Sequence, residues 1–366
     1  MKSAARFGII SFAGLLTAGL ATAASAQQPQ YPKPTELPNP YRLVEDWPTL
    51  PQSMNGGRWG EVIRVHVHSD GNIWIFHRCF NTVPPGSATC IGRGEANPPI
   101  LQFDPSGKLL KSFGAGMFGY PHGFTVDHEG NLWVSDVNDK DTVLGMPARN
   151  AAGDVLGQEV LKLDQNGKVL MMLGKMGVGG SGTDTFDRPT GVAVAANGDI
   201  FVSDGHSPNK SNNGRILKFS KDGKFIKEWG KKGFGPGEFN VPHNLAMDSA
   251  GRLFVGDRSN NRIQVFDQDG KYLLEWRQFG RPSGLFIDKN DMLYVADNSP
   301  DETNPPYRSG IRVGSVHDGI VRAFILESVE VNGVEAVAVD DAGNVYGGYT
   351  NTLNLRRWTP KAAPKS

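Results

Sequence analysis

The chain has 366 residues, of which 39% are hydrophobic, and its 38 basic residues balance its 38 acidic residues. A balanced charge gives no electrostatic basis for binding nucleic acid or an anionic membrane, so neither partner is expected. The 46 glycines and 24 prolines are typical of many short strands joined by turns, and they argue against a helical protein.

The first 26 residues have the features of a secretory signal peptide. Lys2 and Arg6 precede an apolar run rich in Gly and Ala, and Ala-Ser-Ala stands directly before Gln27. We predict cleavage after Ala26 and a periplasmic or secreted protein. The apolar run is too short for a membrane anchor, and the rest of the sequence contains no segment that predicts a membrane span.

The two cysteines of the chain, Cys79 and Cys90, lie in one loop. An oxidising compartment favours a disulfide bond between them, and the absence of further metal-ligand spacing nearby argues against a structural zinc site. Because the closed loop is small, the bond should stabilise the fold by roughly 2–3 kcal/mol at most. Its main effect should be to shape the loop that follows Arg78.

Residues 27–60 are rich in Pro, Gln and Asn and predict an N-terminal extension, after which one pattern repeats six times over residues 61–360. Each repeat predicts short strands, rich in β-branched and aromatic residues, that are bounded by Gly, Asn or Asp turns. The fourth repeat, Val241–Trp276, is the clearest: VPHNLAMDSAGRLFVGDRSNNRIQVFDQDGKYLLEW. The first strands of the other five repeats begin at VIRVHV, PHGFTV, PTGVAV, PSGLFI and VEAVAV.

The sixth repeat lacks its outermost strand, because LNLRRW is followed only by a short tail, residues 361–366. YRLVEDW, residues 41–47, can supply the missing strand, and this pairing would close the ring and remove its exposed edges. We therefore predict an all-β fold, a six-bladed β-propeller closed by an N-terminal strand, and we expect a monomer. One or two β-sandwiches would not explain six repeats of a single pattern.

In a propeller the first strand of each blade lines the central channel, so the residues at which these strands begin should converge near the axis. We call them the lead residues: Ile63, His122, Thr190, His243, Ser283 and Glu335. Of these, His122, His243 and Glu335 are possible zinc ligands, and they come from alternate blades. This approximately threefold arrangement would leave a coordination position open for water or substrate.

Four stretches of the chain carry a resemblance to a known family: IFHR (75–78), PHGFTVDHEGNLWVSDV (121–137), RPTGVAVAANGDIFVSDG (188–205) and VPHNLAMDSAGRLFVGDRSNNRIQVF (241–266). In order and spacing they resemble peptidyl-α-hydroxyglycine α-amidating lyase, a six-bladed propeller of the NHL-repeat type. The resemblance covers most of the chain after the signal peptide. It implies a metal-dependent lyase that cleaves a C–N bond in a small-molecule or peptide substrate carrying a carboxylate.

The resemblance also implies roles for individual residues. Three histidines hold the catalytic zinc of the family; His122 and His243 match two of them, and Glu335 stands in place of the third. Zn²⁺ is the expected metal, and another divalent transition metal such as iron or manganese is the alternative. Two family arginines that bind the carboxylate and hydroxyl of the substrate match Arg78 and Arg258, and a planar guanidinium suits that task.

Two further positions depart from the family pattern. The catalytic tyrosine is replaced by His206, which can act as a base at neutral pH or join the metal ligands. A structural Ca²⁺ in the family is bound partly by backbone carbonyls that match Val65 and Phe124. Its carboxylate ligand maps to Ala336, which has no carboxylate, so Glu335 could serve that ion instead.

The residues leave two other functions open. A non-catalytic NHL propeller that binds a protein or a sugar would hold no metal tightly and would tolerate His122→Ala. A divalent-metal lactonase or hydrolase on the same fold would open esters without releasing glyoxylate. If the protein has no metal site, the two lead histidines are structural polar residues, and Arg78 and Arg258 form salt bridges between blades.

Four recurring aspartates are expected to accept hydrogen bonds at strand ends: Asp136, Asp204, Asp257 and Asp297.

Overall fold

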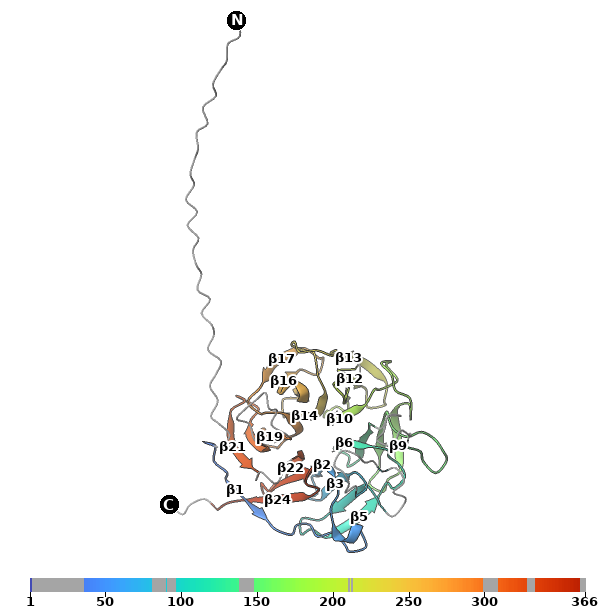
Figure 1. Ribbon diagram of the computed structural model, residues 1–366, viewed down its shortest axis with the longest axis vertical. Helices are drawn as coiled ribbons and strands as arrows, with labels where there is room; N and C mark the ends of the chain where they lie inside the picture. The colour runs from blue at the N-terminus through green and yellow to red at the C-terminus, as the bar shows by residue number, and fades with distance from the viewer. Residues whose placement is uncertain are drawn as a thin grey trace. The chain divides into compact units, whose positions relative to one another are not determined.

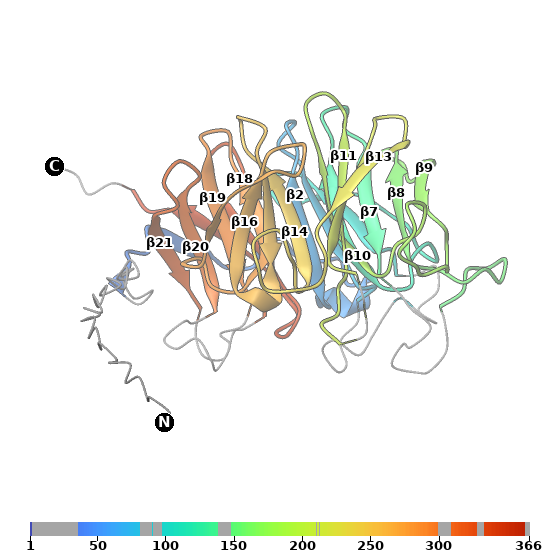
Figure 2. The same cartoon turned by 90° about the horizontal axis from the view of Figure 1, so that it is seen from above.

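In the computed structural model, six four-stranded antiparallel sheets surround a common axis (Figure 1). Besides Met1, the structure describes residues 36–80, 90, 97–137, 148–209, 211, 213–298, 309–327 and 333–362. The predicted signal peptide lies almost entirely outside these residues. Seen from the side, the strands run between the two faces of the ring (Figure 2).

Five blades follow the chain outward, each with its first strand innermost and its fourth strand at the rim. Blade by blade, their strands are β2 (Val62–Val67), β3 (Ile73–His77), β4 (Ile100–Phe103) and β5 (Leu109–Phe113); β6 (Pro121–Val126), β7 (Leu132–Asp136), β8 (Glu159–Leu163) and β9 (Val169–Gly174); β10 (Pro189–Val194), β11 (Ile200–Asp204), β12 (Arg215–Phe219) and β13 (Phe225–Trp229); β14 (Pro242–Met247), β15 (Leu253–Asp257), β16 (Arg262–Phe266) and β17 (Tyr272–Trp276); β18 (Pro282–Ile287), β19 (Met292–Asp297), β20 (Gly310–Ser315) and β21 (Val321–Leu326).

The sixth blade joins both ends of the chain. It consists of β22 (Val334–Val339), β23 (Val345–Tyr349), β24 (Leu355–Pro360) and, at the rim, β1 (Tyr41–Val44). β1 pairs antiparallel with β24, with Leu43 opposite Trp358, so the predicted closure is confirmed. The strand is shorter than the predicted 41–47. Asp46 adopts a left-handed conformation (φ 55°), and Trp47 turns into the apolar cluster between blades six and one.

The hydrophobic core is divided among the six contacts between neighbouring blades. Each contact contains its own cluster of buried side chains, such as the one that joins Ile63 and Phe76 of blade one to Phe124 and Leu161 of blade two. Burial of apolar surface between blades is the main force that holds such a ring together. In the part of the chain that the structure describes, the helices are two 3₁₀ turns, η2 (Asn55–Gly57) and η3 (Arg258–Asn260), and none is long and apolar enough to cross a membrane.

A β-bulge lies at the lead residue of every blade. In blade four, Pro242 pairs with Asp257 and Asn244 pairs with Gly256, so His243 between them has no partner in the ladder. The same register shift occurs at the start of β2, β6, β10, β18 and β22. Bulges bend a strand and change the direction of its side chains. Here they leave each lead residue, near the axis, without a partner on the neighbouring strand.

Antiparallel pairing brings a second set of residues to the same end of each blade. Because the second strand ends opposite the start of the first, residues directly after the second strand lie beside the lead residues. Arg78 follows β3, His206 follows β11 after one glycine, Arg258 follows β15 and Asn298 follows β19. The lead residues and these four side chains therefore share one face of the ring.

The aspartates at the ends of the second strands accept hydrogen bonds, as predicted. Asp136 accepts from the backbone N–H groups of Gly119 and Tyr120, just before β6. In blades three, four and five the equivalent acceptors bind N–H groups before β10, β14 and β18 at 2.7–3.0 Å. These bonds tie the end of each second strand to the segment that leads into the same blade.

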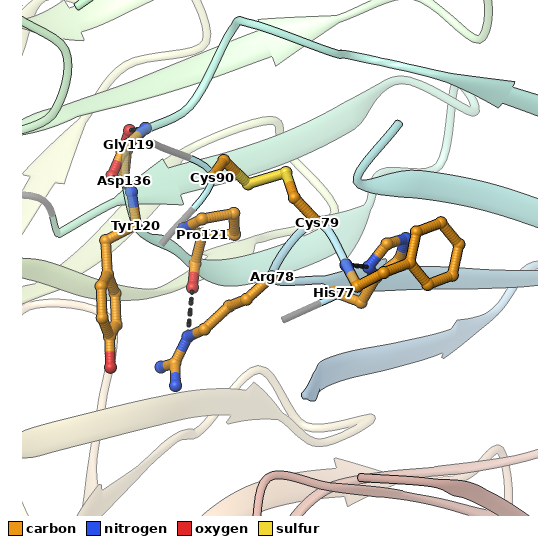
Figure 3. The surroundings of a disulfide bond; sticks show 9 residues. His77, Arg78, Cys79, Cys90, Gly119, Tyr120, Pro121 and Asp136 are labelled. Atoms are coloured by element: carbon orange, nitrogen blue, oxygen red, sulfur yellow. Dashed lines mark hydrogen bonds between the residues drawn. A yellow bond between two sulfur atoms is a disulfide. The ribbon is translucent and has the colours of Figure 1, made fainter. Parts of the chain in front are cut away.

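The predicted disulfide between Cys79 and Cys90 is confirmed. The backbone N–H of Cys90 donates to the carbonyl oxygen of Gly119 at 2.9 Å, which places the bond beside the start of β6. Figure 3 shows Arg78, the residue before Cys79, extending from this bond toward Pro121 and the ring of Tyr120. The covalent link thus borders the face on which the lead residues gather.

Candidate metal centre

Three imidazoles meet at the end of the propeller where the lead residues lie. The Nε2 atoms of His122 and His243 are 3.1 Å apart, and the ring centroid of His206 lies 4.4 Å from that of His122. One ligand nitrogen from each of the three rings lies within 4.8 Å of the other two. His122 and His243 are fully buried, whereas His206 is partly exposed. Over the described ranges, this is the single such grouping of three or more potential metal-ligating side chains.

Hydrogen bonds orient the two buried rings. His122 Nδ1 lies 3.2 Å from the carbonyl oxygen of Thr190, and His243 Nδ1 lies 2.8 Å from that of Ser283. A carbonyl oxygen only accepts, so each Nδ1 carries the proton and each Nε2 presents a lone pair. Two lone pairs then face each other at 3.1 Å, an arrangement that repels unless a cation lies between them.

Glu335 adds a carboxylate to the two imidazoles. Its Oε1 atom lies 3.1 Å from His243 Nε2, and its Oε2 accepts a hydrogen bond from Asn298 Nδ2. The guanidinium groups of Arg64 and Arg258 lie 3.9 and 3.7 Å from Oε1. The carboxylate is buried, and these neighbours compensate its charge.

The three histidines are neutral at neutral pH. Burial is the largest cause that lowers the pKa of each ring well below its usual value of 6.5, and nearby positive groups lower it further. Neutral imidazole is the form that binds a metal ion. Burial also lowers the pKa of Arg258 to about 10, against the opposing charge of Glu335, so Arg258 stays cationic.

Arg78 and Arg258, the two arginines that the resemblance assigns to substrate binding, differ in how many of their N–H groups are hydrogen-bonded. Arg78 donates from Nη1 to Glu61 Oε2 at 2.6 Å and from Nε to the carbonyl oxygen of Pro121 at 3.3 Å, and its guanidinium stacks 4.0 Å from the Tyr120 ring centre (Figure 3). By contrast, Arg258 Nε has no hydrogen-bond partner among the described residues, and its side chain is 14% exposed. Arg258 therefore has one buried donor that no described group satisfies.

The structure brings together most of the residues predicted from sequence. His122, His243 and Glu335 meet from blades two, four and six, His206 joins them from blade three, and Arg258 borders the group. Val65 and Phe124 lie further along the first strands, where they line a cavity of about 380 Å³. Arg64, Asn298 and Glu61 were missed. Asn298 has a sequence signal, because it follows the second strand as Arg258 does.

Fold and repeats define the class of the molecule: it is an NHL-repeat six-bladed β-propeller. The family model of the NHL repeat matches residues 186–219 and 239–266, which lie in blades three and four. The chain is also 37% identical over 209 residues to a probable peptidyl-alpha-hydroxyglycine alpha-amidating lyase of Caenorhabditis elegans, covering 54% of this chain and 53% of that protein. It is 29% identical over 365 residues to peptidyl-glycine alpha-amidating monooxygenase B of Xenopus laevis, covering 92% of this chain and 38% of the relative.

These matches confirm the resemblance to the amidating lyases, although the chain spans only about half or less of the length of either relative. Among solved structures, a gluconolactonase from Xanthomonas campestris is similar with a TM-score of 0.54 at 13% identity, over 88% of this chain and 98% of that chain. At that identity the likeness shows a shared fold alone.

Proposed function

We propose that the protein is an exported, metal-dependent lyase that cleaves the C–N bond of a hydroxylated substrate carrying a carboxylate. The observation that carries the proposal is the position of His243 Nε2, which lies 3.1 Å from His122 Nε2 and 3.1 Å from Glu335 Oε1. Similarity to peptidyl-alpha-hydroxyglycine alpha-amidating lyases supports the type of reaction. The disulfide supports export, since such bonds persist in oxidising compartments.

The donor set fits a divalent transition metal. His122, His243 and Glu335 would hold it, because two imidazole nitrogens and a carboxylate oxygen are a known catalytic zinc set and leave a position for substrate. The spacings of about 3 Å from His243 Nε2 to His122 Nε2 and to Glu335 Oε1 are those that tetrahedral bonds of about 2 Å require. When bound, Zn²⁺ would favour loss of a proton from a hydroxyl oxygen, less strongly than in a three-histidine site because Glu335 adds negative charge.

The remaining residues supply binding and proton transfer. We assign the carboxylate of the substrate to Arg258, whose side chain is partly exposed, and to Arg78, which Glu61 and Tyr120 hold in place. His206 lies against both metal-binding rings and is partly exposed, so it can reach the substrate hydroxyl.

In the proposed step, His206 takes the proton of the hydroxyl on the carbon that also bears nitrogen and the carboxylate. The C–O bond becomes a carbonyl as the C–N bond breaks, and the nitrogen leaves with the bonding electrons and takes a proton. An α-hydroxyglycine group is thereby converted to an amide and glyoxylate, with no oxidant or reductant needed. The arginines hold the carboxylate before and after cleavage, so orientation is kept through the step.

Two measurements on protein recovered from the periplasm or medium, expected to begin at Gln27, test the proposal. Wild type should contain about one transition-metal ion per chain by elemental analysis and release glyoxylate from an α-hydroxyglycyl peptide. The variant His122→Ala/His243→Ala should lose both, whereas His317→Ala, whose side chain is 69% exposed, should keep both. Substoichiometric metal in wild type, or lactone opening without glyoxylate release, would contradict the proposal.

A further inference from the structure

Arg64 lies at the centre of the ring, one residue after the lead residue of blade one. It is 3% exposed. Its Nη1 donates to the carbonyl oxygens of Ile63 at 2.7 Å and Glu335 at 3.2 Å, and its Nη2 donates to that of His243 at 3.2 Å. One guanidinium thus joins the backbones of blades one, four and six, which are 179 and 271 residues apart from it in sequence.

The carbonyls that Arg64 binds need hydrogen-bond donors. They belong to bulged positions of the first strands, whose residues have no partner in the ladder register, and an unpaired buried carbonyl is costly. A guanidinium presents five donors in a planar fork, so one side chain can bridge several carbonyls. Burial lowers the pKa of Arg64 to about 10, and Glu335 opposes that shift, so the group remains charged at neutral pH.

The same region does not fit the structural Ca²⁺ that the resemblance implies. Calcium requires several oxygen ligands, with carboxylates among them in tight sites. Ala336 supplies none, and the carboxylate of Glu335 faces His243 Nε2 and accepts a hydrogen bond from Asn298. Arg64 lines the cavity that also contains Val65 and Phe124, and its positive charge would repel a second cation there.

We propose that the guanidinium of Arg64 replaces a structural divalent cation at the axis, so that the fold of this chain is independent of calcium. The side chain cross-links three blades through their backbones, as an ion held by carbonyl oxygens would. It also lines the cavity of about 380 Å³ that is bounded by residues further along the first strands. The inference concerns the fold and holds whether or not the histidine group is catalytic.

The test compares melting temperature and bound calcium in wild type, Arg64→Met, Arg64→Lys and the double variant Arg64→Met/Ala336→Asp. Each protein is dialysed into calcium-free buffer and melted with and without about 5 mM Ca²⁺, above the range of weak protein sites. The exposed Arg58 provides the control Arg58→Met. The measurements require no substrate and no activity.

Wild type should contain no stoichiometric calcium, and its melting temperature should be the same with and without the ion. Arg64→Met should melt about 5 °C lower or more, because three buried carbonyls and Glu335 lose a partner, and Arg64→Lys should fall between the two. The double variant should gain a melting temperature that rises with calcium. Calcium bound by wild type, an Arg64→Met variant that melts like Arg58→Met, or a double variant that ignores calcium would each overturn the inference.

Discussion

Glu335 contacts the imidazole of His243, whereas His206 lies against the rings of both His122 and His243. Glu335 is buried, and its Oε1 lies 3.1 Å from His243 Nε2, a spacing suited to two ligands of one cation. His206 is partly exposed and stacks edge-on against His122 with ring centroids 4.4 Å apart. The two residues therefore suit different roles, although either could in principle supply the third ligand.

Single substitutions separate these roles. Glu335→Gln should lower metal content to a minor fraction of one ion per chain, because a neutral amide is a poor ligand for zinc. His206→Asn should keep the metal and lower kcat by about 10²–10⁴, the usual contribution of a general base. Elemental analysis and glyoxylate kinetics on the same preparations make the comparison. Metal lost from His206→Asn but kept by Glu335→Gln would reverse the two assignments.

In blades three and four, the aspartate at the end of the second strand faces an arginine at the start of the third strand. Asp204 lies opposite Arg215 and Asp257 opposite Arg262, with ion pairs of 3.1 and 2.8 Å. In blade two the residue opposite the equivalent aspartate is the buried Glu159. Its Oε1 accepts from the N–H of Gly157, and its Oε2 has no hydrogen-bond partner among the described residues.

We predict that Glu159→Gln stabilises the protein above neutral pH. Burial, and then the charge of Asp136, raise the pKa of Glu159 well above its usual value, so the native state favours the protonated form. The stability contributed by that proton is complete below the pKa of an unfolded glutamate, about 4.3, and is lost as the pH rises through the folded pKa. Glutamine resembles the protonated acid at every pH. The variant should melt about 2–4 °C higher near pH 8 and like wild type near pH 4.

The control is Glu129→Gln in the same blade, where the side chain is 77% exposed. It should change the melting temperature little at either pH, since an exposed carboxylate gains little from protonation. Equal melting of Glu159→Gln and wild type across the whole range would show that Glu159 is ionised without cost in the native state.

The same elements show what the sequence could and could not predict. The turn and the alternation of apolar residues identify each first strand in the sequence. His122, His243 and Glu335 could therefore be assigned to equivalent positions from the sequence alone. Arg64 could not be identified in this way. In VIRVHV it is one of several polar residues that alternate with apolar ones, and only the folded ring shows that this side chain binds the backbones of blades four and six.

His206 illustrates a second limit. The sequence shows that His206 is two residues after Asp204, the last residue of β11. Its contact with His122 depends on the path of the loop after Asp204 and on the packing of blade two against blade three. Loops have no repeating pattern from which their direction can be derived. The sequence therefore left both roles of His206 open, a base or a metal ligand, and could not show how its ring lies against the other two.

At the scale of the whole molecule, the candidate centre exists only because the ring is closed. Its donors come from blades two, three, four and six, and no two of these blades share a continuous sheet. Blade six in turn depends on β1, which the chain supplies from its N-terminal side to pair with β24. The cluster of side chains at the axis therefore depends on the pairing of β1 with β24 at the rim.

Anomalous X-ray diffraction from crystals of the purified protein, measured on both sides of the zinc absorption edge, tests whether a metal ion lies between the two imidazoles. We expect one strong peak per chain, about 2.0–2.2 Å from Nε2 of His122, Nε2 of His243 and Oε1 of Glu335. A different transition metal would give the same peak at its own edge. A map without a peak between the two imidazoles, or with the metal bound elsewhere on the chain, would contradict this expectation.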